Sequence, residues 1–522
     1  MPRELPGFYF DPEKNRYFAI KGPIPGFSNL QRPPLKEPDK QPNEQHSVCS
    51  QRKGIRTANL LQFRELYGGK VAPFGKGRCS FQHEYQKNRA SQPMIWKYKK
   101  TDMIADSALE QLRIDIQTPE GENEANGLLM GSTNGSLSFY EVSKDEQDFD
   151  YGIKCTPDFV WPLLQETQAE CSNAPGHIWR PAGASEIMPS HISCIQRTQK
   201  HSLCTPDDGP SNLTQHALIT TLGSDTSGGS LYMLNLSEPL DLNPTDPVLR
   251  RRITKVASVN CTIWTADCNT NGSEAVIGTN VGATLVNLET GAFSWLCRCR
   301  SDLFSLKFDH SGNIIICGFR NGAIVTVDVR QKQGVSAGLP RHQIPYSSCT
   351  LRGASSINPR KFSRQMFELR GNIRPSCTTS MSSSISSLVA LQTYDQYFLA
   401  STLDGSIKLY DHRLTQRGAV QSYEGQVNSH THIQLGVDPS ESVVMSGGED
   451  GYVRIWGIKT AQLLFSSRIS SSAPAALCWP GIGKQPLPKK RRECEDDDIH
   501  AQIHSWGAWL GSKDGLFHVQ GL

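Results

Sequence analysis

Short apolar runs alternate with glycine-containing turns along most of this chain of 522 residues. In the clearest copies an apolar run ends in small side chains, a turn follows, and the next run alternates apolar and polar positions. Each turn has Asn, Asp or Gly before Gly, with an intervening Val in one copy. Such turns favour a β-hairpin because they need positive φ, which Gly and Asn tolerate. Seven copies occur, at Asn134-Gly135, Gly228-Gly229, Asn280-Val281-Gly282, Asn321-Gly322, Asp404-Gly405, Asp450-Gly451 and Asp514-Gly515.

The repeat predicts a propeller. A unit of about 40–45 residues, with four strands and a hairpin between the second and third, is the sequence signature of a WD-repeat propeller blade. Some intervals between turns fit one unit, whereas those from residue 135 to 229 and from 322 to 405 are roughly double that length. We therefore predict an all-β, seven-bladed WD-repeat propeller over residues 97–522, with long loops in the wide intervals. An eighth, degenerate blade between residues 145 and 190 stays open.

The charge balance and the cysteines narrow the class of protein. With 54 basic and 51 acidic side chains, the formal net charge of +3 implies no global attraction to nucleic acid or membrane, so a protein partner is the default. Fifteen cysteines are scattered without a disulfide or zinc layout, and Cys297 and Cys299 are too close together for a CxxC motif. We expect these thiols to be small core residues in a reducing compartment. No leading apolar segment and no run of ~18 apolar residues occurs, so we expect a location in cytosol, nucleus or both.

Two segments precede the predicted blades. Residues 1–54 are rich in Pro, Gln, Lys and Asn and poor in aliphatic residues, which predicts a largely disordered tail. An aromatic island at residues 5–18 interrupts this tail and is expected to pack on the propeller or to dock on a partner. Residues 55–96 are predicted to be helical or irregular, with a short helix over residues 55–69 that starts at Thr57 and stops at Gly68. This helix could cover the side of the propeller or bind a partner; the sequence leaves both open.

Two further segments are strongly charged. The insert at residues 333–383 is Ser-rich and basic, which predicts a solvated, flexible loop; a binding surface is the alternative. Its charged residues are Arg341, Arg352, Arg360, Lys361, Arg364, Arg370 and Arg374 against Glu368 alone. A charged loop at residues 484–498 contains the basic tetrad Lys489, Lys490, Arg491 and Arg492, followed by a run of acids. A nuclear-import signal and a self-neutralising surface loop both fit this tetrad.

The sequence contains none of the usual constellations of catalytic residues. It has no phosphate-cradling Gly-rich loop that opens a helix, no nucleophile elbow and no HExxH motif. His430 and His432 flank Thr431, but neither Cys nor acid stands beside them at ligand spacing, so we expect packing or hydrogen bonding rather than metal binding. We therefore expect no catalytic residue, no metal and no cofactor. A propeller enzyme would need acids or histidines that converge at the central channel, and the sequence does not reveal them.

One tetrapeptide pattern occurs twice, at the end of the predicted third strand of successive recognisable blades. The two copies are Val327-Asp328-Val329-Arg330 and Tyr410-Asp411-His412-Arg413. In each copy an apolar or aromatic residue is followed by an acid, then by any residue and then by an Arg, which places the Arg at the strand end, on one rim of the propeller. Two such arginines on neighbouring blades are expected to lie near each other. The alternative is structural, because Asp at this point also stabilises blades and Arg is a common surface residue.

These boxes resemble the one by which WD-repeat substrate receptors of cullin-4 RING ubiquitin ligases attach to the damaged-DNA-binding adaptor of the ligase. The likeness extends to one receptor family, that of WD-repeat protein twenty-one, also called cullin-4-associated factor four. It covers about a third of the chain: the segment Leu5–Phe18 and the blades around residues 300–470, above all Tyr397–Trp456. Two departures exist, since Tyr410 and Val327 stand where the family pattern has Trp and no Trp-Asp dipeptide occurs in the chain.

The resemblance implies a non-catalytic substrate receptor. The residues that it assigns to adaptor binding are Tyr410, Asp411, Arg413, Asp328 and Arg330. Another propeller face would hold an unidentified substrate protein, with no membrane and no direct nucleic-acid contact. The competing interpretation is a WD-repeat scaffold of a nuclear RNA- or chromatin-related assembly, in which the basic insert would carry the main interaction and the two rim arginines would be dispensable.

Overall fold

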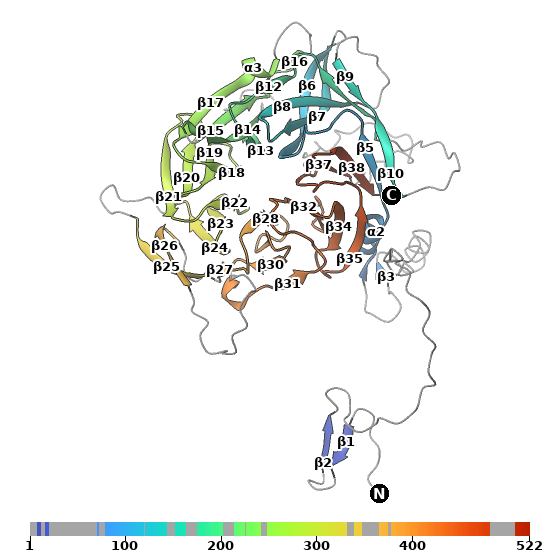
Figure 1. Ribbon diagram of the computed structural model, residues 1–522, viewed down its shortest axis with the longest axis vertical. Coiled ribbons are helices and arrows are strands. Elements are labelled where there is room, and N and C mark those ends of the chain that lie inside the picture. Colours follow the sequence, from blue (N-terminus) through green and yellow to red (C-terminus); the bar gives the residue numbers. More distant parts are fainter. Residues whose placement is uncertain are drawn as a thin grey trace, which may run out of the picture. The chain divides into compact units, whose positions relative to one another are not determined.

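Within the unit that spans residues 55–522, the described residues form a ring of sheets around a central axis, and the strands pair antiparallel except for β16 with β6 (Figure 1). The computed structural model describes residues 8–11, 16–19, 70–71, 79–118, 121–143, 152–162, 175–201, 213–224, 226–241, 248–330, 339–346, 365–373, 377–480 and 507–521. Seven of the sheets in the described residues are blades of this ring, so the prediction of a seven-bladed β-propeller is confirmed.

Four blades have the simple four-stranded layout. Blade 2 consists of β13 (Ile192–His201), β14 (Leu213–Ser224), β15 (Gly228–Asn235) and β17 (Ile253–Val259). Blade 4 consists of β22 (Leu303–Phe308), β23 (Ile314–Phe319), β24 (Ala323–Asp328) and β27 (Thr379–Ser380). Blade 5 consists of β28 (Ile385–Ala390), β29 (Tyr397–Thr402), β30 (Ile407–Asp411) and β31 (Gln421–Tyr423). Blade 6 consists of β32 (Leu435–Val437), β33 (Val443–Gly447), β34 (Tyr452–Gly457) and β35 (Leu463–Arg468).

Blade 7 closes the ring by joining strands from the two ends of the propeller. It contains β36 (Ala476–Cys478), β37 (Gly507–Ser512) and β38 (Gly515–Gly521), and then β5 (Pro93–Tyr98) and β10 (Pro157–Trp161) from the other end. β38 pairs antiparallel with β5, for example Val519 with Ile95. Because this pairing connects the first and last blade strands through backbone hydrogen bonds, the ring leaves no open sheet edge at its seam.

The seven predicted turns all join the second and third strands of a blade. One Gly of each turn has positive φ, as in Gly405 with +81° and Gly282 with +134°. At Gly405 an added Cβ would also lie 2.8 Å from the carbonyl oxygen of Gln426, so the position needs Gly for both conformation and space. The local turn chemistry therefore fixes one hairpin per blade.

The region considered for an eighth blade is shared between two existing sheets. Blade 1 consists of β6 (Ala108–Thr118), β7 (Gly121–Gly131) and β8 (Ser136–Ser143), and then β11 (His177–Pro181) and β9 (Gly152–Cys155). It also holds β12 (Ser185–Ile187), which pairs with β8, and β16 (Leu240–Asp241), which pairs with β6. The remaining strand of the region, β10, belongs to blade 7. These residues thus widen blades 1 and 7, and the eighth blade does not form.

The basic insert was predicted to be one flexible loop, and this was wrong for three of its segments. One is β27 of blade 4, and the other two form further strands. Residues 341–346 form β25 (Arg341–Tyr346) and residues 365–371 form β26 (Gln365–Gly371). Both strands extend blade 3, which otherwise consists of β18 (Ile263–Cys268), β19 (Glu274–Thr279), β20 (Gly282–Asn287) and β21 (Phe293–Cys299). The physical reason is apolar burial: Ile344 and Leu369 are buried and belong to the core between blades 3 and 4.

Few elements lie outside the blades. Helix α2 (Phe81–Ser91) contacts β34 and β35 of blade 6, helix α3 (Val248–Arg252) leads into β17, and β3 (Lys70–Val71) pairs with β4 (Cys79–Ser80). Within the N-terminal unit, β1 (Phe8–Asp11) and β2 (Arg16–Ala19) form a hairpin in which the aromatic island pairs with itself. The rest of the predicted tail and the helix predicted over residues 55–69 lie outside the described residues. Helix α2 lies within residues 55–96, which were predicted to be helical or irregular, although no helix was predicted at residues 81–91 in particular.

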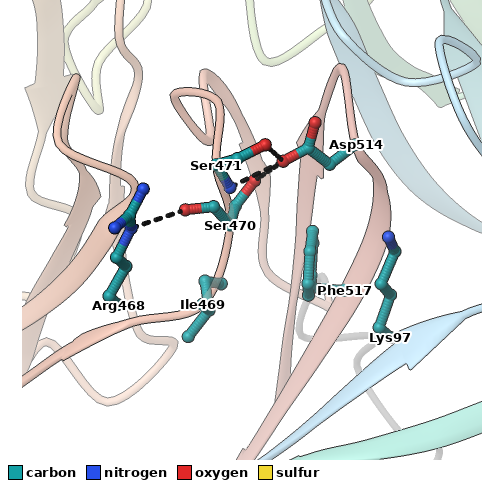
Figure 2. A pocket seen from close by; sticks show the side chains of 7 residues that line it. All are labelled: Lys97, Arg468, Ile469, Ser470, Ser471, Asp514 and Phe517. Carbon is teal, nitrogen blue, oxygen red and sulfur yellow. Dashed lines mark hydrogen bonds between the residues drawn. The ribbon is translucent and has the colours of Figure 1, made fainter.

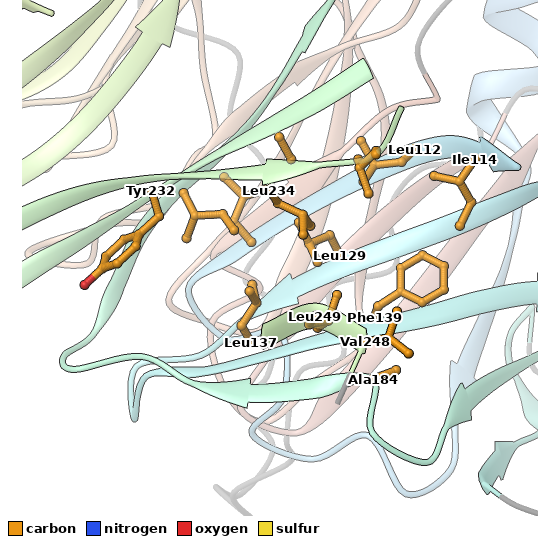
Figure 3. Packing of buried hydrophobic residues seen from close by; sticks show 14 of the residues in the cluster. Leu112, Ile114, Leu129, Leu137, Phe139, Ala184, Tyr232, Leu234, Val248 and Leu249 are labelled. Carbon is orange, nitrogen blue, oxygen red and sulfur yellow. The ribbon is translucent and has the colours of Figure 1, made fainter. Parts of the chain in front are cut away.

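The hydrophobic core lies between neighbouring blades. Figure 3 shows the cluster between blades 1 and 2, where Leu112, Leu129 and Phe139 of blade 1 face Leu234 of blade 2. Corresponding clusters fill the spaces between the other blades. Each central strand is consequently covered on both faces, so its side chains are buried on both sides rather than alternately.

Candidate functional site on the arginine rim

The propeller has two rims that differ in their loops. The turn rim carries the seven glycine turns between second and third strands. The opposite rim, named here the arginine rim, carries the ends of the third strands. Asp328 pairs with Ile314, the first residue of β23, and Asp411 pairs with Tyr397, the first residue of β29, so both boxes lie on the arginine rim. They occupy equivalent positions on the neighbouring blades 4 and 5.

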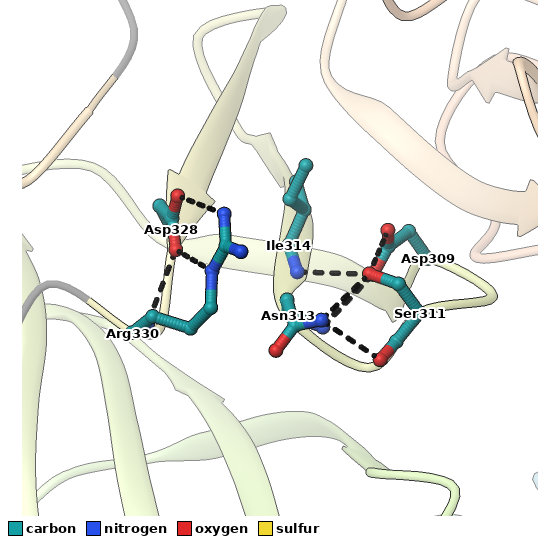
Figure 4. A network of polar contacts seen from close by, with 6 residues as sticks. All are labelled: Asp309, Ser311, Asn313, Ile314, Asp328 and Arg330. Atoms are coloured by element: carbon teal, nitrogen blue, oxygen red, sulfur yellow. Dashed lines mark hydrogen bonds and ion pairs between the residues drawn. The ribbon is translucent and has the colours of Figure 1, made fainter.

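In blade 4 the Asp and Arg of the box are joined by several hydrogen bonds (Figure 4). The carboxylate of Asp328 is buried and accepts three hydrogen bonds from Arg330: from the backbone N–H at 3.1 Å, from Nε at 3.1 Å and from Nη2 at 3.0 Å. The Arg330 side chain remains 60% exposed. The hydrogen bond and charge of Asp328 raise the pKa of Arg330. Because only two of the five guanidinium N–H groups enter these bonds, the side chain is oriented and still has donors for a partner.

Blade 5 repeats this geometry. The carboxylate of Asp411 accepts hydrogen bonds from the backbone N–H of Arg413 at 2.9 Å, from its Nε at 3.0 Å and from its Nη2 at 2.9 Å. The Arg413 side chain is 61% exposed, whereas Asp411 is buried. The side-chain bond from Arg413 lowers the pKa of Asp411, so the carboxylate stays ionised and keeps the guanidinium in place. The structure therefore presents two pre-oriented arginines on adjacent blades.

Tyr410 does not belong to this surface, which corrects its assignment as an adaptor contact. Its side chain is 2% exposed and stacks on Phe398 at 5.4 Å between ring centroids. The cluster that surrounds it combines Ile316 and Ile324 of blade 4 with Leu388 of blade 5. Burial raises the pKa of Tyr410 to about 12. The ring therefore stabilises the contact between the two blades that carry the arginines.

The same position in other blades has different chemistry. In blades 2 and 3 an Asn takes the place of the Asp, and the side-chain oxygen of Asn287 accepts the N–H of Glu289 at 3.0 Å. Asn235 likewise accepts the N–H of Ser237 at 3.0 Å. A side-chain oxygen that accepts the backbone N–H two residues later is thus a recurrent cap of the third-strand end. The Arg two residues after the capping residue distinguishes blades 4 and 5 within blades 2–6. Comparison of the repeats at this position finds the pair from sequence.

One apolar residue of the rim was missed by sequence reasoning. Leu414 follows Arg413 directly and is 44% exposed, although its size favours burial. An exposed Leu beside an oriented Arg is typical of interface patches, where apolar contact and charged hydrogen bonds act together. The only available signal in the sequence was its position next to the box.

Acidic and basic groups also meet between the innermost strands, which the sequence did not reveal. Lys307 of blade 4 donates to the carboxylate of Asp267 of blade 3 at 3.3 Å and to Oε1 of Gln196 of blade 2 at 3.0 Å. Glu110 of blade 1 interacts electrostatically with Arg197 and Lys307, and burial raises the pKa of Glu110 to about 7. Because Lys307 and Asp267 are engaged with each other, their arrangement fits a structural link between blades.

A small cavity opens on the turn rim between blades 6 and 7 (Figure 2). Its volume is about 330 Å³, and Lys97, Arg468 and Asp514 contribute charges to its lining. The Asp514 carboxylate accepts bonds from the Ser471 hydroxyl at 2.6 Å, from the Ser471 N–H at 2.7 Å and from the Ser470 hydroxyl at 2.7 Å. These bonds lower the pKa of Asp514 and fix the loop that follows β35.

Several other expectations concern isolated groups. His430 lies 3.2 Å from the Glu449 carboxylate, and His432 contacts the backbone oxygen of Phe304 at 3.3 Å. Within the described residues, no three His, Cys, Asp or Glu side chains gather as metal ligands do. Nor does that part of the chain contain a helix long and apolar enough to cross a membrane. The basic tetrad at residues 489–492 lies outside the described residues, and nuclear import stays a prediction.

Comparisons with known proteins agree with the resemblance noted in the sequence. A family profile described as the DDB1- and CUL4-associated factor 4 beta-propeller domain matches residues 344–478, which include the blade 5 box. The human protein named DDB1- and CUL4-associated factor 4 is 24% identical over 482 residues, covering 91% of this chain and 80% of that protein. The bovine protein of the same name is 23% identical over 476 residues, covering 88% and 78%. The human DDB1- and CUL4-associated factor 4-like protein 2 is 38% identical over 97 residues, which are 19% of this chain and 23% of that protein.

Proposed function

We propose that this chain, which is similar to DDB1- and CUL4-associated factor 4 over most of its length, is a non-catalytic substrate receptor that links a target protein to a cullin-4 RING ubiquitin ligase. In this role the arginine rim of blades 4 and 5 binds the DDB1 adaptor. The names of the relatives state an association with DDB1 and CUL4 for those proteins, and the propeller gives this chain a matching scaffold. The observation that carries the proposal is the pair of equivalent, exposed and oriented arginines, Arg330 and Arg413.

The geometry of the pair suits a protein interface. Arg presents a planar fork that bonds carbonyl or carboxylate oxygens, and it is enriched among the residues on which binding depends most. Orientation by a buried Asp reduces the side-chain freedom that binding would otherwise remove, because the fork is already fixed in the free protein. Leu414, exposed beside Arg413, adds apolar area to the same patch.

The test is capture of purified DDB1 by the full-length chain, measured by pull-down and by biolayer interferometry. The double variant Arg330→Ala with Arg413→Ala is expected to bind DDB1 roughly tenfold or more weakly, since two central contacts are removed. The matched control is Arg320→Ala, which removes an exposed Arg of blade 4 on the turn rim, where it pairs with Asp302 at 3.0 Å. Undiminished DDB1 binding by a folded double variant would refute the assignment of the site.

A further inference from the structure

Strands β26 and β25 carry blade 3 beyond its four regular strands. β21 pairs with β26, and β26 pairs with β25, so the blade becomes a six-stranded sheet that protrudes at the outer edge of the ring (Figure 1). One face of this extension packs on blade 4: Ile344 and Leu369 are buried, and Phe367 lies 6.0 Å from Phe319 between ring centroids. Because successive side chains of a strand point to opposite faces, the residues between them point the other way.

The other face carries a row of arginines. Arg298 lies directly opposite Arg370, and Arg370 lies directly opposite Arg341. Directly opposed residues point to the same face, so the three guanidinium groups cross three adjacent strands in one line. Arg300, two residues after Arg298, acts electrostatically on Glu368 of the same face. We call Arg298, Arg300, Arg341 and Arg370 the arginine row; all four are exposed.

Acidic side chains neutralise little of the positive charge of the arginine row. Glu368 is the one acid in β25 and β26, and it accepts a hydrogen bond from Nε of Arg370 at 3.0 Å while lying 3.8 Å from Nε of Arg341. These arginines lower the pKa of Glu368, so its charge is fully present at neutral pH. One carboxylate against four guanidinium groups leaves a local excess of positive charge. Like charges directly opposed on a sheet are destabilising, so fold stability does not account for the row.

We propose that the arginine row docks an acidic segment of a partner protein. The inference rests on the proposed function in one respect: the partner is then the substrate, bound by side chains other than Arg330 and Arg413. Arg forks pair with carboxylates in two parallel hydrogen bonds, and a flat sheet face presents them at strand spacing to an extended chain. Met366, 50% exposed on the same face, offers an apolar contact beside the charges.

A protein segment fits this surface better than a nucleic acid. Single-stranded nucleic acids need open aromatic faces on which bases stack. Trp295 lies beside the row, and the guanidinium of Arg298 already covers its ring at 4.7 Å from the centroid. The overall charge of +3 likewise provides no wide positive field of the kind that backbone-directed binding uses.

Fluorescence anisotropy of the full-length chain with a labelled peptide, in which Glu alternates with Ala, tests the proposal. The variant Arg341→Glu with Arg370→Glu is expected to bind the peptide about tenfold or more weakly, and the wild-type affinity is expected to fall as salt rises from about 50 to about 200 mM. Arg341→Lys with Arg370→Lys should give an intermediate affinity, because charge remains and the fork is lost. The matched control reverses the same charge on the turn rim through Arg320→Glu with Lys513→Glu, and should bind as wild type does.

The outcomes separate this inference from the proposed function. The variant Arg330→Ala with Arg413→Ala is expected to keep its peptide affinity while it loses DDB1, and the row variant is expected to do the reverse. Thermal unfolding checks that the row variant melts no lower than wild type. Equal peptide affinity of the row variant and wild type would overturn the proposal. Tighter binding of an oligothymidylate of the same length than of the peptide would overturn it in favour of nucleic acid.

Discussion

Replacement of Glu110 by Gln is expected to stabilise the propeller at neutral and alkaline pH. Glu110 lies on β6, the innermost strand of blade 1, and burial raises its pKa to about 7 from an ordinary value of 4.5. Arg197 and Lys307 oppose this rise, Asp267 adds to it, and desolvation is the largest of these effects. The folded protein therefore carries a carboxyl group that resists ionisation, whereas the unfolded chain ionises it in water without a penalty.

The sign and size of this change in stability follow from proton linkage. Between about pH 4.5 and 7 the folded state binds more protons at this site than the unfolded state, so the stability contributed by Glu110 is present below pH 4.5 and is lost as pH rises through 7. A difference of about 2.5 pKa units corresponds to roughly 3 kcal/mol. Gln has the shape of the protonated side chain and cannot ionise, so the variant avoids this loss.

Urea unfolding of wild type and Glu110→Gln between about pH 5 and 8 measures the effect. The variant should gain about 1 kcal/mol relative to wild type at the acid end and about 3 kcal/mol at the alkaline end. The difference between the two proteins is the useful quantity, because His518 contributes the opposite slope to both: burial lowers its pKa to about 4. Glu424→Gln, at an exposed site, controls for the removal of a carboxylate.

A pH-independent difference between the two proteins would contradict the reasoning. So would a Glu110→Gln variant that is less stable than wild type at pH 8, because that result would mean that Arg197 or Lys307 stabilises an ionised Glu110 in solution. Either result would assign the inner-strand charges to a network of ion pairs rather than to a desolvated, protonated acid.

Three further perturbations test the fold and the site. Gly405→Ala should destabilise the protein by about 1–3 kcal/mol in urea unfolding, because φ is +81° and the new Cβ would press on the Gln426 carbonyl. Tyr410→Phe should leave DDB1 capture unchanged, since the ring is buried, and weaker capture by the folded variant would contradict its core role. Trp456→Phe should cost about 2 kcal/mol in the same unfolding assay, because it removes the bond from Nε1 to the Glu424 carbonyl at 2.9 Å and leaves a void in a fully buried site.

The blades were predictable because their signal is local. A turn that needs positive φ must use Gly, Asn or Asp within two or three residues, and the adjoining apolar runs identify the strands that it joins. The strands at residues 341–346 and 365–371 were not predictable, because their apolar faces comprise only Ile344 in one and Phe367 and Leu369 in the other. Their partner β21 ends at Cys299, far away in sequence, so only the assembled core between blades 3 and 4 selects this pairing.

The candidate site was predictable in part for a related reason. The Asp-x-Arg pattern specifies a cap and an exposed side chain, both of which depend on the strand end alone. Burial of Tyr410 depends instead on blade 4, whose Ile316 and Ile324 cover it. In β30, Leu409, Tyr410 and Asp411 are all buried although they alternate in direction, because neighbouring blades cover both faces. Alternation in the sequence therefore cannot separate a core aromatic from an interface aromatic in such a strand.

The arginine rim and the arginine row differ in how far acidic side chains neutralise their positive charge, and this difference implies different binding behaviour. Arg330 and Arg413 are each paired with a buried Asp, so they form oriented hydrogen-bond donors of low net charge. Contacts of this kind depend on fit and resist salt, as a fixed assembly with an adaptor requires. The arginine row has one Glu368 for four guanidinium groups, so its attraction is longer in range and more strongly screened. Under the proposed function, this division supplies rigid, neutralised donors for the adaptor and uncompensated charge for the substrate.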